Sequence, residues 1–179
     1  MLTQIRKTLR CALYRTSICT TICKQEGWSI HQFNQVDWTA HELAFQQTWS
    51  SKRITYTKLA HALLNTNVQN HKYYGKSALC PCCGLFDETL QHVFTCVAPE
   101  VIEFRRKQQD ILWNQLDLIN TPTHVENDIK QGILSLEAEL HPTDLEYSTK
   151  AGLAQAGLGW VAFLRGRIST QWQYDYNGR

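Results

Sequence analysis

Three cysteines and one histidine, Cys80, Cys83, His92 and Cys96, stand in the spacing C-x2-C-x8-H-x3-C. Thiolate sulfur and imidazole nitrogen are the ligands that zinc takes in four-coordinate structural sites. When protein fills all four positions, no position remains for a reactive water or a substrate. The array therefore predicts one Zn²⁺ ion with a structural role.

The first cysteine pair lies in Cys80-Pro81-Cys82-Cys83-Gly84, a sequence that predicts a tight turn. Pro81 fixes φ at a turn value, and Gly84 tolerates a left-handed backbone that lets N–H groups point at sulfur. Cys82 is an alternative ligand to either neighbour. Adjacent cysteines direct their side chains apart, so Cys80 and Cys83 are the preferred pair.

The second pair of ligands is predicted to come from a short helix. Asp87 is a candidate cap for this helix, and His92 and Cys96, four residues apart, then fall on one face. A turn that supplies two thiolates and a helix that supplies a histidine and a cysteine can converge on one ion without strain.

Three other interpretations of the cysteines stay open. CxxC can arise by chance among cysteines that are buried as small apolar residues. Cys80-Pro81-Cys82-Cys83 also matches the C-P-x-C of redox proteins, but the βαβ context that such a site needs is missing. Zinc deaminases place H-x-E before P-C-x-x-C, whereas here His124-Val125-Glu126 follows the cysteines.

The charge of the chain is divided unevenly. Residues 1–80 contain ten Lys or Arg against three Asp or Glu, and residues 81–179 contain eight against thirteen. The halves carry +7 and −5, which leaves a formal net charge of +2. A basic half suits a polyanion such as RNA or DNA, although a solvated face or attraction between the halves would show the same pattern.

The remaining cysteines, Cys11, Cys19 and Cys23, form an odd set, which argues against a secreted disulfide framework. We therefore expect an intracellular, reducing compartment, the nucleus or the cytoplasm. The basic segment before Glu26 also has the composition of a mitochondrial transit peptide. No apolar run is long enough to span a membrane, so we expect a soluble protein without a membrane partner.

Helical periodicity dominates the chain and predicts a mainly α fold, a small helical domain with a CCHC zinc knuckle between helical hairpins. Four regions are expected: a basic N-terminal helix or extension over residues 1–26, a helical hairpin and a basic-aromatic loop over 27–79, the zinc module over 80–98, and C-terminal helices over 99–179. In the hairpin, Asp37 caps a helix that runs to about Ser50, and a second helix covers residues 55–64.

The C-terminal region is expected to begin with two amphipathic helices. Pro99 opens the first, and Pro122 occupies the first position of the second, which ends at His141-Pro142. A final helical segment follows from about Leu145, with small residues for close approach and a bulky stripe that includes Trp160. Arg165-Gly166-Arg167 is expected to project from its polar side.

Basic and aromatic residues of the N-terminal half are the candidates for nucleic-acid contact. Lysine and arginine neutralise phosphates, and exposed tyrosines can stack on bases, although loop tyrosines also pack on their own domain. The candidates are Lys52, Arg53, Lys58, Lys72, Tyr73, Tyr74 and Lys76.

These residues together resemble the C-terminal zinc-binding tails that follow the reverse transcriptase and RNase H regions of retroelement polyproteins. The similarity runs from Gly27 to Trp172 and includes the order of C-x2-C, H-x3-C and a downstream tryptophan-rich helix. The segments that carry it are Gly27-Trp28, Val36-Asp37-Trp38-Thr39-Ala40-His41, Thr57-Lys58-Leu59-Ala60-His61, Cys80 to Cys96, Gly159-Trp160, Phe163-Leu164-Arg165-Gly166-Arg167-Ile168-Ser169 and Gln171-Trp172.

The resemblance implies a non-catalytic accessory domain that helps a reverse transcriptase/RNase H polyprotein hold its RNA or DNA. It carries over only the four zinc ligands, and the catalytic motifs of the polymerase and of RNase H are not recognisable, so we expect no enzyme and no small-molecule substrate. An alternative is an interaction scaffold in which Trp160 and Trp172 dock a neighbouring polyprotein domain. An exposed tryptophan patch would favour that alternative.

Overall fold

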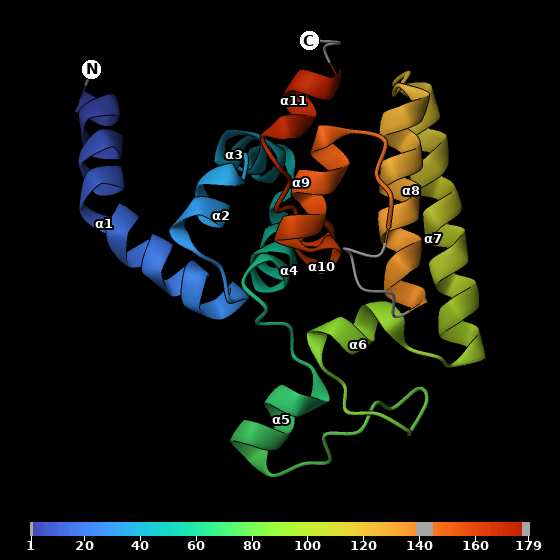
Figure 1. The fold of residues 1–179 in the computed structure, drawn as a ribbon. Helices are drawn as coiled ribbons and strands as arrows, with labels where there is room; N and C mark the ends of the chain where they lie inside the picture. Colours follow the sequence, from blue (N-terminus) through green and yellow to red (C-terminus); the bar gives the residue numbers. More distant parts are fainter. Residues whose placement is uncertain (1, 139–144, 177–179) are drawn as a thin grey trace.

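The computed structural model describes residues 2–138 and 145–176. Within these residues the chain forms eleven helices and no strand, which confirms the prediction of a mainly α fold (Figure 1). Two isolated antiparallel bridges, between Val36 and Ser169 and between Leu79 and Asp87, are the β-type pairings of these residues.

The N-terminal half contains five helices. They are α1 (Leu2–Glu26), α2 (Ile30–Gln35), α3 (Trp38–Gln47), α4 (Ser50–Ala60) and α5 (Asn67–Tyr74). Asp37 caps α3 as predicted, because its carboxylate accepts a hydrogen bond of 2.8 Å from the Ala40 N–H. The predicted pair of helices is present as α3 and α4, but α3 ends at Gln47 and α4 begins already at Ser50.

Helix α5 occupies much of the basic-aromatic loop that is predicted after the helical hairpin in region 27–79, and so corrects that prediction. The Asn67 N–H lies in the first turn of this helix and has no acceptor within the helix. It donates instead to the Glu88 carboxylate at 2.6 Å. Gly75 ends the helix with φ +64°, a left-handed conformation that glycine adopts without strain. The cap comes from a residue 21 positions away, so local periodicity does not reveal it.

The described residues of the C-terminal half form six further helices, α6 (Leu90–Thr95), α7 (Pro99–Leu118), α8 (Thr123–Glu137), α9 (Lys150–Leu158), α10 (Trp160–Leu164) and α11 (Gln171–Tyr176). Helices α7 and α8 lie side by side in Figure 1. Pro99 opens α7 as predicted, whereas Pro122 precedes α8 instead of being its first helical residue. The predicted stop at His141-Pro142 lies outside the described residues.

The main hydrophobic core forms around Trp160, which is only 1% exposed. Val125, Ile129 and Ile133 on one face of α8 pack against it, and its indole N–H donates to the Tyr147 hydroxyl at 2.8 Å. Leu112, Leu116 and other partly buried side chains of α7 complete the cluster. The cysteines belong to a second, smaller cluster of buried residues that comprises Cys80, Cys96 and Ala98.

Arg165 and Arg167 are buried, at 7% and 1% exposed, which contradicts their predicted projection into solvent. Arg165 donates to the Ala60 carbonyl and, at 2.7 Å, to the Glu26 carboxylate, so it connects the C-terminal ends of α4 and α1. The Arg167 guanidinium also donates to Ala60 and lies 4.7 Å from the Trp38 ring centroid. The unpaired carbonyls at a helix C-terminus are the acceptors that draw both side chains inward. Burial lowers the pKa of Arg167 to about 10, which leaves it charged at neutral pH.

Substitution of two helical glycines by alanine should have opposite effects on stability, because their surroundings differ. A Cβ at Gly132 in α8 would overlap the Trp160 indole ring, whereas a Cβ at Gly157 in α9 meets no atom within 4 Å. Urea unfolding should show Gly132→Ala destabilised by about 2 kcal/mol, and Gly157→Ala stabilised by about 0.5 kcal/mol because alanine favours helix. Equal effects of the two changes would contradict this packing around Trp160.

Candidate metal centre

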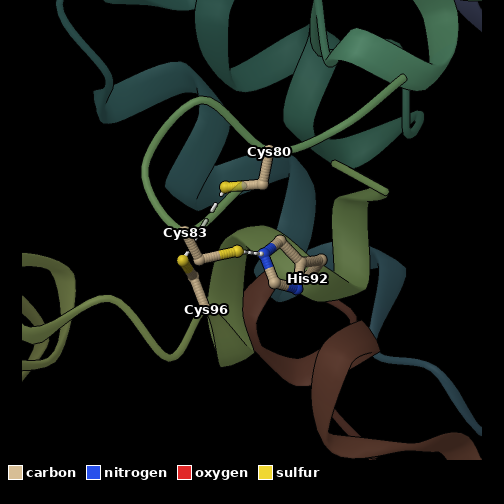
Figure 2. A group of neighbouring side chains, drawn as sticks. All are labelled: Cys80, Cys83, His92 and Cys96. Atoms are coloured by element: carbon tan, nitrogen blue, oxygen red, sulfur yellow. Dashed lines mark hydrogen bonds between the residues drawn. The ribbon is translucent and has the colours of Figure 1, made fainter. Parts of the chain in front are cut away.

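The four predicted ligands converge at one point (Figure 2). Their four ligand atoms all lie within 4.8 Å of one another. Cys80 Sγ is 3.7 Å from Cys96 Sγ, and Cys83 Sγ is 3.4 Å from His92 Nε2. A tetrahedral ion with bonds of ~2.3 Å to sulfur and ~2.0 Å to nitrogen needs edges of about 3.8 and 3.6 Å. The group can therefore hold a metal ion.

A tight turn presents the first two sulfurs, as the sequence predicts. Gly84 has φ +65°, and its N–H donates to the Cys80 carbonyl at 2.8 Å. The Cys80 N–H in turn donates to the Phe86 carbonyl at 2.7 Å, which closes the turn. Cys82 is exposed and stands outside the group of four, so the geometry favours Cys80 and Cys83 over their neighbour.

The short helix α6 presents the other two ligands, but Asp87 is not its cap. Asp87 pairs with Leu79 in an isolated bridge, and the Thr89 hydroxyl caps α6 by accepting from the His92 N–H at 3.0 Å. The bridge holds Asp87 in extended backbone two residues before the cap position, so its carboxylate is not the group that meets the first turn. His92 is 8% exposed, and Cys96 is the first residue after the helix.

Two of the sulfurs stand in contrasting electrostatic surroundings. The backbone N–H groups of Leu85 and Phe86, with a further contribution from His92, lower the pKa of Cys83 to about 6. Burial raises the pKa of Cys96 to about 11, although the Ala98 N–H acts in the opposite direction. Cys83 is thus a thiolate at neutral pH, whereas a cation is needed to draw the proton from Cys96.

Hydrogen bonds on two sides fix the cysteine module to the remaining helices. On one side, the Asn67 side chain donates to the Leu79 carbonyl at 2.7 Å, next to the bond between the Asn67 N–H and Glu88. On the other, Arg105 of α7 donates to the Cys96 carbonyl at 3.3 Å and forms an ion pair of 2.7 Å with Glu137 of α8. The module therefore positions α5 relative to α7 and α8.

All seven predicted nucleic-acid contacts are exposed, and they form two groups. Lys52, Arg53 and Lys58 belong to α4, whereas the others lie on α5 or directly after it, in a part of the molecule that Figure 1 shows apart from α4. Tyr73 and Tyr74 are 66% and 72% exposed, so both rings are available for stacking.

Three exposed aromatic residues of α3, α4 and their connection are missing from the predicted site. Phe45 and Trp49 recur at helical intervals, a spacing typical of a packed face, yet Trp49 is 80% exposed and no described side chain of α3 is buried. Tyr56 is 45% exposed on α4. The alternation of aromatic and basic residues over residues 45–58 is a sequence signal that could have identified them.

No protein-family model, curated protein or solved structure matches this chain. In the described part of the chain, no helix combines the length and the apolar character that crossing a membrane requires.

Cobalt(II) titration tests the metal centre, because tetrahedral thiolate coordination of cobalt gives characteristic visible absorption. We expect saturation at one ion per chain for the wild-type protein. Cys96→Ser should abolish the signal, since it removes a ligand, while Cys82→Ser serves as the matched control and should retain it. Loss of the signal in Cys82→Ser with retention in Cys96→Ser would show that the ligand set is wrong.

Proposed function

We propose that the chain is a non-catalytic, zinc-stabilised domain that binds RNA or DNA. Three thiolates and one imidazole whose ligand atoms all lie within 4.8 Å of one another are a donor set that zinc prefers. With four protein ligands the ion has no open position, so its role would be to fix structure. This accounts for the choice of zinc as the cofactor.

The observation that carries the proposal is the attachment of a basic, aromatic helix to the metal module. The hydrogen bonds from Asn67 tie the start of α5 to the module, and the end of α5 exposes Lys72, Tyr73 and Tyr74. A cation beside stacking rings is the combination with which proteins hold single-stranded nucleic acid. Zinc would thus act on binding by holding this helix in place.

The proposed context is the one that the resemblance to retroelement tails implies. The domain would support a reverse transcriptase/RNase H polyprotein on its RNA or DNA, in the reducing nucleus or cytoplasm. The +7 charge of residues 1–80 supports contact with a polyanion.

The alternative of a scaffold that docks through Trp160 and Trp172 loses its support. Trp160 is 1% exposed, and Trp172 packs against the same core. Side chains that stabilise the core are not available to a partner without unfolding it. Nucleic-acid binding therefore accounts better for the surface of this chain.

A salt titration of oligonucleotide binding tests the electrostatic part of the proposal. Lys72→Gln together with Lys76→Gln should reduce the slope of log Kobs against log salt by about 1.5, because two phosphate contacts are lost. Fluorescence anisotropy with single- and double-stranded RNA and DNA gives the measurement. The matched control is Lys107→Gln with Lys150→Gln, two exposed lysines of the acidic half. Wild-type affinity that does not change with salt would end the proposal.

Metal removal tests the structural role of zinc. Elemental analysis should find one zinc per chain, and a strong chelator should then expose residues 66–98 to hydrogen exchange, because the metal supplies their folding energy. Protection in α8 and α10 should persist, since the core around Trp160 contains no metal ligand. Nucleic-acid affinity should fall with the loss of protection. Unchanged exchange over residues 66–98 would contradict a structural metal.

A further inference from the structure

A cavity of about 370 Å³ lies between α3, α4 and the end of α10. It is distinct from the metal centre and shares none of its ligands. Its size falls within the range of small-ligand pockets. The residues that shape it include His41, Ala44, Phe45, Tyr56, Phe163 and Arg165.

The rings at this cavity are accessible from outside. Phe45 is 37% exposed and Tyr56 is 45% exposed, and the two residues come from different helices. Two aromatic side chains that line one cavity and reach solvent offer faces to a flat, unsaturated ring. A planar ligand can therefore enter between α3 and α4.

The interior of the cavity favours an uncharged ligand. The guanidinium of Arg165 already donates to the Glu26 carboxylate and to the Leu59 and Ala60 carbonyls. His41 Nδ1 donates to the Gly166 carbonyl at 3.0 Å, and burial lowers the pKa of His41, which keeps the ring neutral near pH 7. A phosphate inside the cavity would thus meet cations that are already paired or a neutral imidazole.

Cations stand beside the aromatic rings instead. Lys52 is exposed one helical turn before Tyr56, on the same face of α4, and the Arg53 guanidinium lies 6.0 Å from the Phe45 ring centroid. Positive charge next to an aromatic cavity whose own guanidinium is already paired complements a ligand that joins a phosphate to a flat base. This arrangement selects a nucleotide over an apolar peptide.

We propose that this cavity binds an unpaired base of single-stranded RNA or DNA, with Phe45 and Tyr56 as stacking surfaces and Lys52 beside the adjacent phosphate. The inference rests on the proposed function and makes it more specific. A base within a duplex is already stacked and paired, so only a single strand can place a base in the cavity. RNA and DNA both offer a flat base joined to a phosphate, and the test compares the binding of the two.

The test uses the full, metal-loaded chain with RNA and DNA oligonucleotides of equal length that are single-stranded, double-stranded or abasic at every position. Wild-type protein should bind single strands about tenfold more tightly than abasic strands, because bases contribute through stacking. Ala44→Trp should reduce this difference by filling the cavity, and the part that remains belongs to Tyr73 and Tyr74 on α5; an unchanged difference in Ala44→Trp would contradict the role of the cavity. Ala44 is exposed, so the change leaves the core intact. Leu43→Trp, an exposed neighbour that does not line the cavity, is the matched control and should retain the difference.

A second pair of variants preserves the test if Ala44→Trp does not fold. Tyr56→Phe keeps the stacking ring and should retain the tenfold preference, whereas Tyr56→Ala should lose most of it. Equal binding of base-containing and abasic strands, with salt dependence intact, would contradict base binding in the cavity but would leave the proposed function of nucleic-acid binding in place. Absence of salt-dependent binding to every oligonucleotide would instead overturn the proposed function itself.

Discussion

The convergence of three sulfurs and one imidazole is the interaction on which the middle of this chain depends. The hydrophobic cluster around the site comprises Cys80, Cys96 and Ala98, with Cys83 and Val101 partly buried against it. Leu85 and Phe86, its largest apolar neighbours in the turn, are 69% and 54% exposed. So little apolar burial cannot offset the ordering of about twenty residues, since each costs about 1–2 kcal/mol of backbone entropy. Coordination of a metal is the interaction available to supply the free energy that apolar burial does not provide.

The remaining helices depend on other interactions. Trp160 organises an ordinary hydrophobic core with α7 and α8, while Arg165 and Arg167 connect α10 to the ends of α1 and α4. Arg105 of α7 joins the cysteine segment to the helices of this core, because it donates to both the Cys96 carbonyl and the Glu137 carboxylate of α8. Residues 80–98 and the core around Trp160 have separate sets of buried residues. With this division, a metal at the four ligands would influence the position of α5 more than the core.

Local rules determined much of the fold and the identity of the candidate ligands. The spacing of Cys80, Cys83, His92 and Cys96 matches four protein ligands around one ion, and turn chemistry at Gly84 follows from its conformational freedom. Asp37 and Pro99 mark helix starts because capping and proline geometry act within a few residues. Helical periodicity was likewise sufficient for a mainly α fold.

Interactions between distant residues decided the rest. Phe45 and Trp49 recur at helical intervals, but burial requires a partner element that covers the side chain, and no residue of α3 is buried in the described structure. Arg165 and Arg167 read as surface residues by their charge, yet the free carbonyls at the end of α4, more than a hundred positions away, accept their hydrogen bonds. The sequence by itself determined which side chains can ligate and which segments can be helical, because those depend on chemistry and short-range geometry. Only the tertiary structure decided which charges are buried and which rings are exposed, since these properties belong to pairs of elements.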